Sequence, residues 1–275
     1  DAQESRGLGD VYKRQLYVAN DAPGHYSLEV FDVSSGNVRH VKSMVEWMNG
    51  DKKETFAGEP NGVTRSYGKI YVTNTGSRTD VFDAETYEFI TCIGTGTWGE
   101  GGYQTVHAFD VTASQGAVFI RDKRKLVVVL EQDVQPGSAA RVPIYSRSVN
   151  LQEAMGTYAV AARNDGFLYV TAQNKNIIYL FDPADIRAGD TGFAPYLVTL
   201  GFEKSPQSIA FVGDRLFVTL RVDDKRSELW EISPKNGKLL QDFTDSMVYP
   251  EKIAGARHTL LVVDRATQTV KAIGL

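Results

Sequence analysis

The sequence is short of cysteine, of long apolar runs and of surplus positive charge, and each shortage excludes a class of protein. Its one cysteine, Cys92, rules out an internal disulfide and a thiolate-rich metal site. The longest strongly apolar stretch, residues 126–130, has the length of a strand, whereas a membrane-spanning helix needs about 20 apolar residues. The formal net charge is -4, with basic and acidic residues interspersed. We therefore expect neither a nucleic-acid partner nor a transmembrane segment in the visible chain.

What the sequence does contain indicates a folded protein rich in turns. Hydrophobic residues make up 42% of the 275 residues, which is enough for a sizeable core, and glycine (25) outnumbers proline (9). Cys92 lies in the apolar run of residues 90–93, where a small buried residue is a better interpretation than a nucleophile.

A hydrophobic triplet recurs through the chain at intervals of 44 to 54 residues. The six triplets begin at Leu16, Ile70, Val118, Leu168, Leu216 and Leu260. A second apolar run, which ends in Phe-Asp in three copies, starts 9 to 14 residues after each triplet begins. This interval, together with the β-branched and aromatic residues, favours a hairpin of two strands.

Two further strands flank the hairpin and make a repeat of four. Pro60, Pro206 and Pro250 each open a similar strand pattern before a triplet, and residues 89–93 and 238–243 follow hairpins as further strands. Four antiparallel strands repeated at this interval are typical of β-propeller blades, because one small twisted sheet cannot bury both faces alone. We predict an all-β fold, a single β-propeller domain over residues 16–275 with about six visible blades.

The segment Ile70-Tyr-Val-Thr-Asn74, followed by Val81-Phe-Asp83, resembles the YVTN family of propeller repeats, and residues 16–20 and 168–172 are weaker copies. Residues 121–125 depart from the pattern. The resemblance implies a bacterial protein of the periplasm, the cell surface or the extracellular medium, with seven blades in the intact protein as an alternative to six. Its motif specifies blade architecture and implies no ligand.

Both ends of the repeat pattern are incomplete. The first blade shows no strand before its triplet, and the last shows none after its second apolar run. Residues 9–15 resemble the in-frame translation of a sequencing adapter, so we interpret residues 1–15 as a non-native or disordered segment. The native N-terminus would then be missing, and its strand is expected to complete the last blade.

Loops at one face of a propeller surround the mouth of its central channel, and such loops often carry function. Two long connections between blades, residues 43–60 and 94–104, are rich in aromatic residues, and exposed rings suit a small molecule, a glycan or a protein partner. We expect the rings of Trp47, Trp98 and Tyr103 to be exposed, and packing against the blades is the alternative. The predicted ligand-binding residues are Trp47, Trp98, Tyr103, His107, Tyr26, Tyr249 and Asn74.

Polar residues near the same mouth indicate a candidate cation site. Glu59, Asn61 and Glu251 lie where first strands begin, as does Gln207, and oxygen ligands suit a hard cation such as Ca²⁺. Polar residues that line a water-filled channel without a metal are the alternative. Apart from Ca²⁺ no cofactor is expected: residues 94–99 match the spacing G-x-G-x-x-G, but no helix follows, so a turn is favoured.

These features favour a binding protein over an enzyme. The sequence contains no G-x-S-x-G elbow, Walker loop or paired-carboxylate motif, and its four histidines have no metal-ligand spacing. We predict a non-enzymatic, extracytoplasmic propeller that captures a small molecule, a glycan or a protein on its loop face. The alternatives are a propeller hydrolase or lactonase with a divalent cation in the channel, and a structural scaffold for protein contacts.

Overall fold

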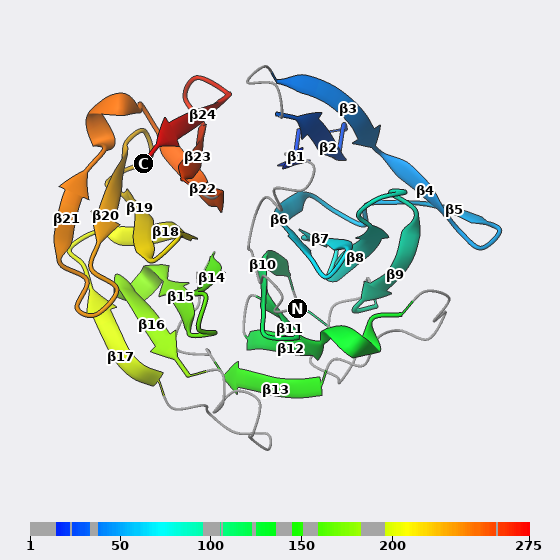
Figure 1. The fold of residues 1–275 in the computed structure, drawn as a ribbon, viewed down its shortest axis with the longest axis horizontal. Helices are drawn as coiled ribbons and strands as arrows, with labels where there is room; N and C mark the ends of the chain where they lie inside the picture. The colour runs from blue at the N-terminus through cyan, green and yellow to red at the C-terminus, as the bar shows by residue number, and fades with distance from the viewer. Residues whose placement is uncertain are drawn as a thin grey trace. The chain divides into compact units, whose positions relative to one another are not determined.

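The computed structural model describes residues 15–22, 24–33, 38–95, 105, 107–122, 125–135, 145–150, 159–182, 196–256 and 258–275. The chain forms two compact units, one ending at Ser148 and the other beginning at Val149. Each unit consists of antiparallel sheets whose strands pair in the order of the sequence (Figure 1). No helix in the described part of the chain is long and apolar enough to cross a membrane. The single domain expected over residues 16–275 stays a prediction.

The described residues of the first unit form three sheets and a separate two-stranded hairpin. Its elements are β1 (Gln15–Asn20), β2 (Ser27–Asp32), β3 (Arg39–Met44), β4 (Glu46–Asn49), β5 (Lys52–Thr55), β6 (Pro60–Ser66), β7 (Lys69–Asn74), β8 (Arg78–Asp83), β9 (Phe89–Ile93), β10 (Ala108–Ser114), β11 (Ala117–Asp122), β12 (Lys125–Leu130), η1 (Glu131–Asp133) and β13 (Tyr145–Asn150). The sheets are β1-β2-β3, β6-β7-β8-β9 and β10-β11-β12-β13, and the hairpin is β4-β5. The boundary between the units falls within β13, after Ser148.

The second unit contains three sheets of the same kind. Its elements are β14 (Val160–Ala162), β15 (Leu168–Ala172), η3 (Gln173–Lys175), β16 (Ile177–Phe181), β17 (Tyr196–Gly201), β18 (Ser205–Val212), β19 (Arg215–Arg221), β20 (Ser227–Ile232), β21 (Leu239–Asp242), η4 (Thr244–Ser246), β22 (Pro250–Ala256), β23 (Thr259–Asp264) and β24 (Thr269–Gly274). The sheets are β14-β15-β16-β17, β18-β19-β20-β21 and β22-β23-β24.

The recurring triplets lie in the strands that the repeat predicted. They occupy β1, β7, β11, β15, β19 and β23, and the second apolar runs occupy β2, β8, β12, β16, β20 and β24. The central strands β7, β15 and β19 are buried along nearly their whole length because sheet neighbours and packed faces surround them. Six successive small antiparallel sheets confirm the predicted β-propeller fold class.

The two terminal sheets have three strands each in the described part of the chain, in the order that the sequence predicted. The first begins at Gln15, one residue earlier than expected. Gln15 pairs with Asp32 in the ladder, and its side chain bonds Tyr17 and Tyr87, each at 2.7 Å. Gln15 is therefore part of the first sheet, and residues 1–14 lie outside the described residues. The interpretation of residues 1–15 as a non-native or disordered segment stays a prediction.

A β-bulge interrupts the first strand of two neighbouring sheets in the second unit. The ladder between β18 and β19 skips Gln207, and the ladder between β22 and β23 skips Glu251. Both residues directly follow a proline, and similar irregularities occur in β6 and β10 of the first unit. A bulge bends its strand and turns the extra side chain in a new direction, which places Gln207 and Glu251 at the sheet edge.

Three of the six triplets are followed by a threonine whose hydroxyl binds a backbone N–H at the start of the neighbouring first strand. The Thr219 hydroxyl, fully buried, accepts a hydrogen bond from the Ser208 backbone N–H at 3.0 Å. Equivalent bonds run from the Gly62 N–H to Thr73 (2.9 Å) and from the Ala159 N–H to Thr171 (3.1 Å). An unpaired backbone N–H is costly in a buried position, so this hydroxyl explains why threonine follows the triplet at these positions.

Sheets β18–β21 and β22–β24 approach closely at a glycine. A Cβ atom on Gly255 of β22 would lie 1.7 Å from the Phe211 carbonyl oxygen of β18. The side chains of the two sheets form one cluster that includes Ala210, Val212 and Ile253. The N–H of Ile253 in β22 also donates to the Ser208 hydroxyl of β18 at 3.1 Å, so these two first strands lie side by side.

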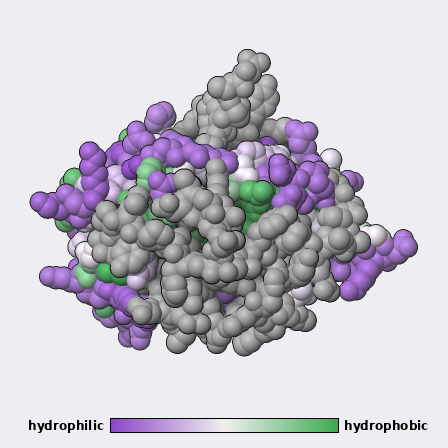
Figure 2. Space-filling model, turned by 90° about the horizontal axis from the view of Figure 1, so that it is seen from below, coloured by the Kyte–Doolittle hydropathy of each residue, from purple (hydrophilic) through white to green (hydrophobic). Residues whose placement is uncertain are grey.

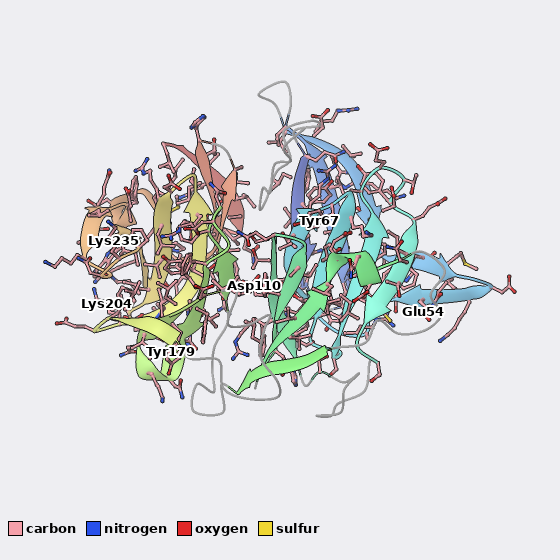
Figure 3. All side chains as sticks on the ribbon, turned by 60° about the horizontal axis from the view of Figure 1, so that its bottom comes forward. Glu54, Tyr67, Asp110, Tyr179, Lys204 and Lys235 are labelled. Carbon is pink, nitrogen blue, oxygen red and sulfur yellow. The ribbon has the colours of Figure 1, made fainter. Side chains whose placement is uncertain are left out.

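The β4–β5 hairpin lies where a loop was expected within residues 43–60. It carries Glu54, which Figure 3 labels, and it extends outward from its neighbouring strands. Glu54 and the Thr55 carbonyl both accept hydrogen bonds from Arg78 of β8, at 3.1 and 2.8 Å.

On the face drawn in Figure 2, hydrophilic residues predominate among those described, with hydrophobic areas between them.

Candidate functional site

A pocket of about 380 Å³ lies in the second unit, at the edge where first strands begin and second strands end. Its size falls in the range typical of small-molecule sites. Polar and charged side chains line it together with one aromatic ring: Gln173, Gln207, Arg221, Asp224, Tyr249, Glu251, Lys252 and Arg265. They come from η3, from three strands and from the turns that follow β19 and β23 or precede β22.

Thr219 connects the two bulges that contribute to the pocket. Its hydroxyl accepts the Ser208 N–H and donates to the Glu251 carbonyl oxygen at 3.0 Å. The Ser208 hydroxyl in turn accepts the N–H of Ile253 at 3.1 Å. These buried bonds hold the backbone on both sides of the pocket, so the bulged side chains Gln207 and Glu251 project from a fixed frame.

Asp264, the last residue of β23, positions Tyr249, the aromatic side chain among the described residues that line this pocket. Its carboxylate accepts the backbone N–H of Tyr249 at 2.9 Å and that of Val248 at 3.0 Å, and Lys271 donates to it at 3.1 Å. Burial alone would raise the pKa of Asp264, but these three donors outweigh it and lower the pKa to about 2. The clamped backbone keeps Tyr249 buried at 4% exposure.

Arginines engage both carboxylates of the pocket. Arg221 forms an ion pair with Asp224, and Arg265 forms one with Glu251 at 3.4 Å. The Arg265 guanidinium also lies over the Tyr249 ring, 5.9 Å from its centroid, which suits a cation–π contact. Lys252, partly buried, has no ion-pair partner in the described part of the chain.

Three residues that the sequence singled out meet in this pocket: Tyr249, Glu251 and Gln207. Sequence reasoning missed Arg221, Lys252, Arg265, Asp224 and Gln173. A signal was available, because Arg221 is the last residue of β19, as Asn74 is of β7, and Arg265 directly follows β23. The sequence-based prediction considered aromatic rings and oxygen ligands and did not include basic side chains such as Arg221 and Arg265.

The expectation of an exposed Trp47 ring is wrong. Trp47 is only 7% exposed and packs on Phe56, Phe82 and Phe89, with ring centroids 4.9, 5.0 and 5.7 Å away. Arg78 lies 5.8 Å from its centroid. The ring belongs to a hydrophobic core cluster because the β4–β5 hairpin folds its apolar face onto the sheet.

The other predicted ligand-binding residues differ in their surroundings. Tyr26 is partly buried against the same cluster as Trp47. His107 is partly buried and stacks on Phe109, with centroids 5.8 Å apart. Trp98 and Tyr103 lie outside the described residues. A role in ligand binding stays a prediction for all of them.

Asn74 is fully buried and hydrogen-bonded to a carboxylate, and its role in ligand binding stays a prediction. Its amide donates to Asp80 at 2.9 Å, and Arg78 forms an ion pair with the other oxygen of Asp80 at 2.8 Å. Burial raises the pKa of Asp80 to about 7, although Arg78 and Asn74 act in the opposite direction. Asn74 thus helps to anchor β8, which also holds the hairpin through Arg78.

The predicted calcium ligands divide between the units. In the first, Asn61 donates to the Glu59 carbonyl at 3.0 Å, and the Glu59 N–H donates to Thr75 at 3.0 Å. Glu251 is in the second, paired with Arg265. Within the described ranges no group of three or more His, Cys, Asp or Glu that could hold a metal ion occurs. A calcium site stays a prediction.

Comparison with known proteins supports the fold. No family model matches the chain, and no curated protein matches it in sequence. Among solved structures it is similar to a chain of a nidogen–laminin complex (TM-score 0.61, 14% identity, 95% of this chain and 89% of the other). A candidate 6-phosphogluconolactonase from Bacteroides fragilis has a TM-score of 0.58 and 13% identity over 98% and 79% of the chains. The Cps50 (Swd1) β-propeller domain of Myceliophteria thermophila has 0.56 and 10% over 98% and 99%. At these identities the likeness concerns the fold alone.

Proposed function

We propose that this β-propeller is a binding protein that holds a small molecule, or one unit of a glycan, in the pocket of its second unit. The observation that carries the proposal is the convergence of Gln207, Glu251 and Tyr249 on one pocket of about 380 Å³. Amides, guanidinium groups and carboxylates at fixed positions suit a ligand rich in hydroxyl and other polar groups.

The contacts of the two carboxylates support the proposed binding. Asp224 and Glu251 are each engaged by an arginine, and Glu251 is further held through its backbone carbonyl by Thr219. Groups fixed in this way are preorganised acceptors for a ligand's hydroxyl groups. Location outside the cytoplasm is part of the proposal and rests on the YVTN-like segment Ile70–Asn74.

The test is a thermal-shift screen of the full chain against small polar compounds, from neutral sugars and polyols to amino acids and organic acids. A compound that binds the folded protein raises its melting temperature in a concentration-dependent way. We expect Gln207→Ala to abolish the shift, because it removes a lining amide. Gln241→Ala, on the exposed strand β21, is the matched control and should keep it.

A compound whose stabilising effect survives in both Gln207→Ala and Arg221→Ala would show binding elsewhere and contradict the pocket. The bound compound should also be recovered chemically unchanged after prolonged incubation, as checked by mass spectrometry. Its conversion by the wild-type chain but not by the pocket variants would replace binding with the hydrolase alternative.

A further inference from the structure

The charge of the pocket differs in sign from that of the chain. The whole sequence carries a net charge of -4, yet the described residues that line the pocket include three cations and two carboxylates. The cations are Arg221, Lys252 and Arg265. A local excess of positive charge in a concave site attracts anions even when the protein as a whole repels them.

The ion pairs within the pocket leave one cation over. Arg221 is matched by Asp224 and Arg265 by Glu251, whereas Lys252 has no ion-pair partner in the described part of the chain. Lys252 is also partly buried. Withdrawing a lysine from water without a counter-charge is unfavourable, so an unmatched lysine in a pocket is a sign that a ligand supplies the charge.

The backbone around Lys252 is fixed. The carbonyl of the preceding residue, Glu251, accepts a hydrogen bond from Thr219 at 3.0 Å, and the N–H of the following residue, Ile253, donates to Ser208 at 3.1 Å. Lys252 itself pairs with Val263 directly after the bulge. The lysine side chain therefore starts from an ordered position at the pocket wall.

We propose that the pocket binds a ligand bearing an oxyanion, a carboxylate or a phosphate, with Lys252 as its counter-charge. This inference rests on the proposed function and specifies the class of its ligand. Arg265, held over the Tyr249 ring and paired with Glu251 at 3.4 Å, adds positive charge at the same site. The amides of Gln173 and Gln207 then face the neutral, hydroxyl-bearing part of the ligand.

The test is isothermal titration calorimetry of the full chain with three probes: D-glucuronate, D-glucose and inorganic phosphate. The two sugars share a ring and differ in one carboxylate. We expect glucuronate to bind about tenfold or more tightly than glucose, since a charge-assisted contact is stronger than a neutral one. Raising NaCl from about 50 to about 500 mM should weaken glucuronate binding and leave glucose binding unchanged.

Variants of Lys252 connect this difference to the proposed contact. Lys252→Gln should weaken glucuronate binding about tenfold and bring it close to that of glucose, while Lys252→Arg should retain most of the affinity. Lys235→Gln is the matched control, because Lys235 is exposed in the β20–β21 turn of the same unit (Figure 3). Circular dichroism checks that each variant is folded.

The probes also separate the two sources of the oxyanion. If phosphate competes with glucuronate, and Lys252→Gln lowers the affinity for phosphate, the two probes share one oxyanion site. Phosphate binding without glucuronate binding assigns a phosphate ligand and still supports the proposal. Equal affinity for both sugars, with no effect of Lys252→Gln, overturns the proposal of an oxyanion ligand. If Gln207→Ala then weakens the binding of both sugars, the pocket is still their binding site. Failure of all three probes to bind also overturns the proposal of an oxyanion ligand. The thermal-shift screen then tests the proposed function separately.

Discussion

At the scale of single residues, Asp264 shows how one buried carboxylate supports the pocket from behind. It accepts two backbone N–H bonds and one lysine contact without touching the pocket space itself. Its pKa in the folded protein is about 2, below the value of about 3.9 for an unfolded chain. The ionised form is therefore favoured by folding, and its contribution to stability is present above pH 4 and lost as the pH falls towards 2.

Asp264→Asn should lower the free energy of unfolding by about 2 kcal/mol at pH 7, because the neutral amide cannot match the three charge-assisted contacts. The measurement is urea unfolding of wild type and variant between pH 7 and about pH 2. The difference should shrink as the pH falls through this window, because the wild-type carboxylate becomes protonated. Asp214→Asn, at an exposed turn position, is the control. A difference independent of pH would contradict the role assigned to the ionised carboxylate.

At the scale of elements, sequence patterns predicted the strands but not their irregularities. The triplets locate β7, β15 and β19 because buried central strands are the most strongly apolar segments. The prolines before Gln207 and Glu251 indicated a shared strand start. The bulge itself is a property of register between two strands, which neither strand records alone, so the direction of these side chains could not be read from the sequence.

Removing the Thr219 hydroxyl should weaken the second unit. Thr219→Val keeps the shape of the side chain but leaves the Ser208 N–H and the Glu251 carbonyl without this partner. We expect a loss of about 1–3 kcal/mol in the free energy of unfolding, measured by urea titration. Thr219→Ser keeps the hydroxyl and should lose clearly less. A negligible loss for Thr219→Val, or a larger loss for Thr219→Ser, would contradict the role assigned to the hydrogen bonds of the hydroxyl.

The β4–β5 hairpin illustrates the competing use of aromatic residues. Trp47 was expected to be a platform for a ligand, but its ring gains more from contact with Phe82 and Phe89 than from water. Composition alone does not distinguish an exposed aromatic loop from a hairpin whose alternate residues are buried. Trp47 and Met48 are adjacent, and one is 7% and the other 56% exposed.

This neighbouring pair supplies a sharp comparison. Trp47→Ala should lower the free energy of unfolding by about 3–5 kcal/mol, because it leaves a cavity in a packed cluster. Met48→Ala should change it by less than about 0.5 kcal/mol, as is usual for an exposed position. Chemical unfolding followed by tryptophan fluorescence and circular dichroism measures both. Similar small effects of the two substitutions would contradict the burial of Trp47.

At the scale of the whole molecule, the fold class followed from the repeat whereas most of the site did not. The repeat is local in the chain and recurs six times, so each copy reinforced the others. The pocket instead combines Gln173 of η3, Arg221 of β19 and Arg265 of the turn after β23, which are far apart in the sequence. Only neighbouring sheets brought together by close contacts such as that at Gly255 make these residues a site.

Hydrogen exchange with bound D-glucuronate should therefore respond in one part of the chain. A ligand present at about 100 times its dissociation constant adds about 2.7 kcal/mol to any opening that destroys its site, which slows exchange about 100-fold there. We expect this slowing in residues 205–212 and 250–256, which form β18 and β22. It should be absent from residues 39–55 of the first unit and abolished by Gln207→Ala. Slowing confined to the first unit would contradict the pocket, since the described residues that line the pocket all belong to the second unit.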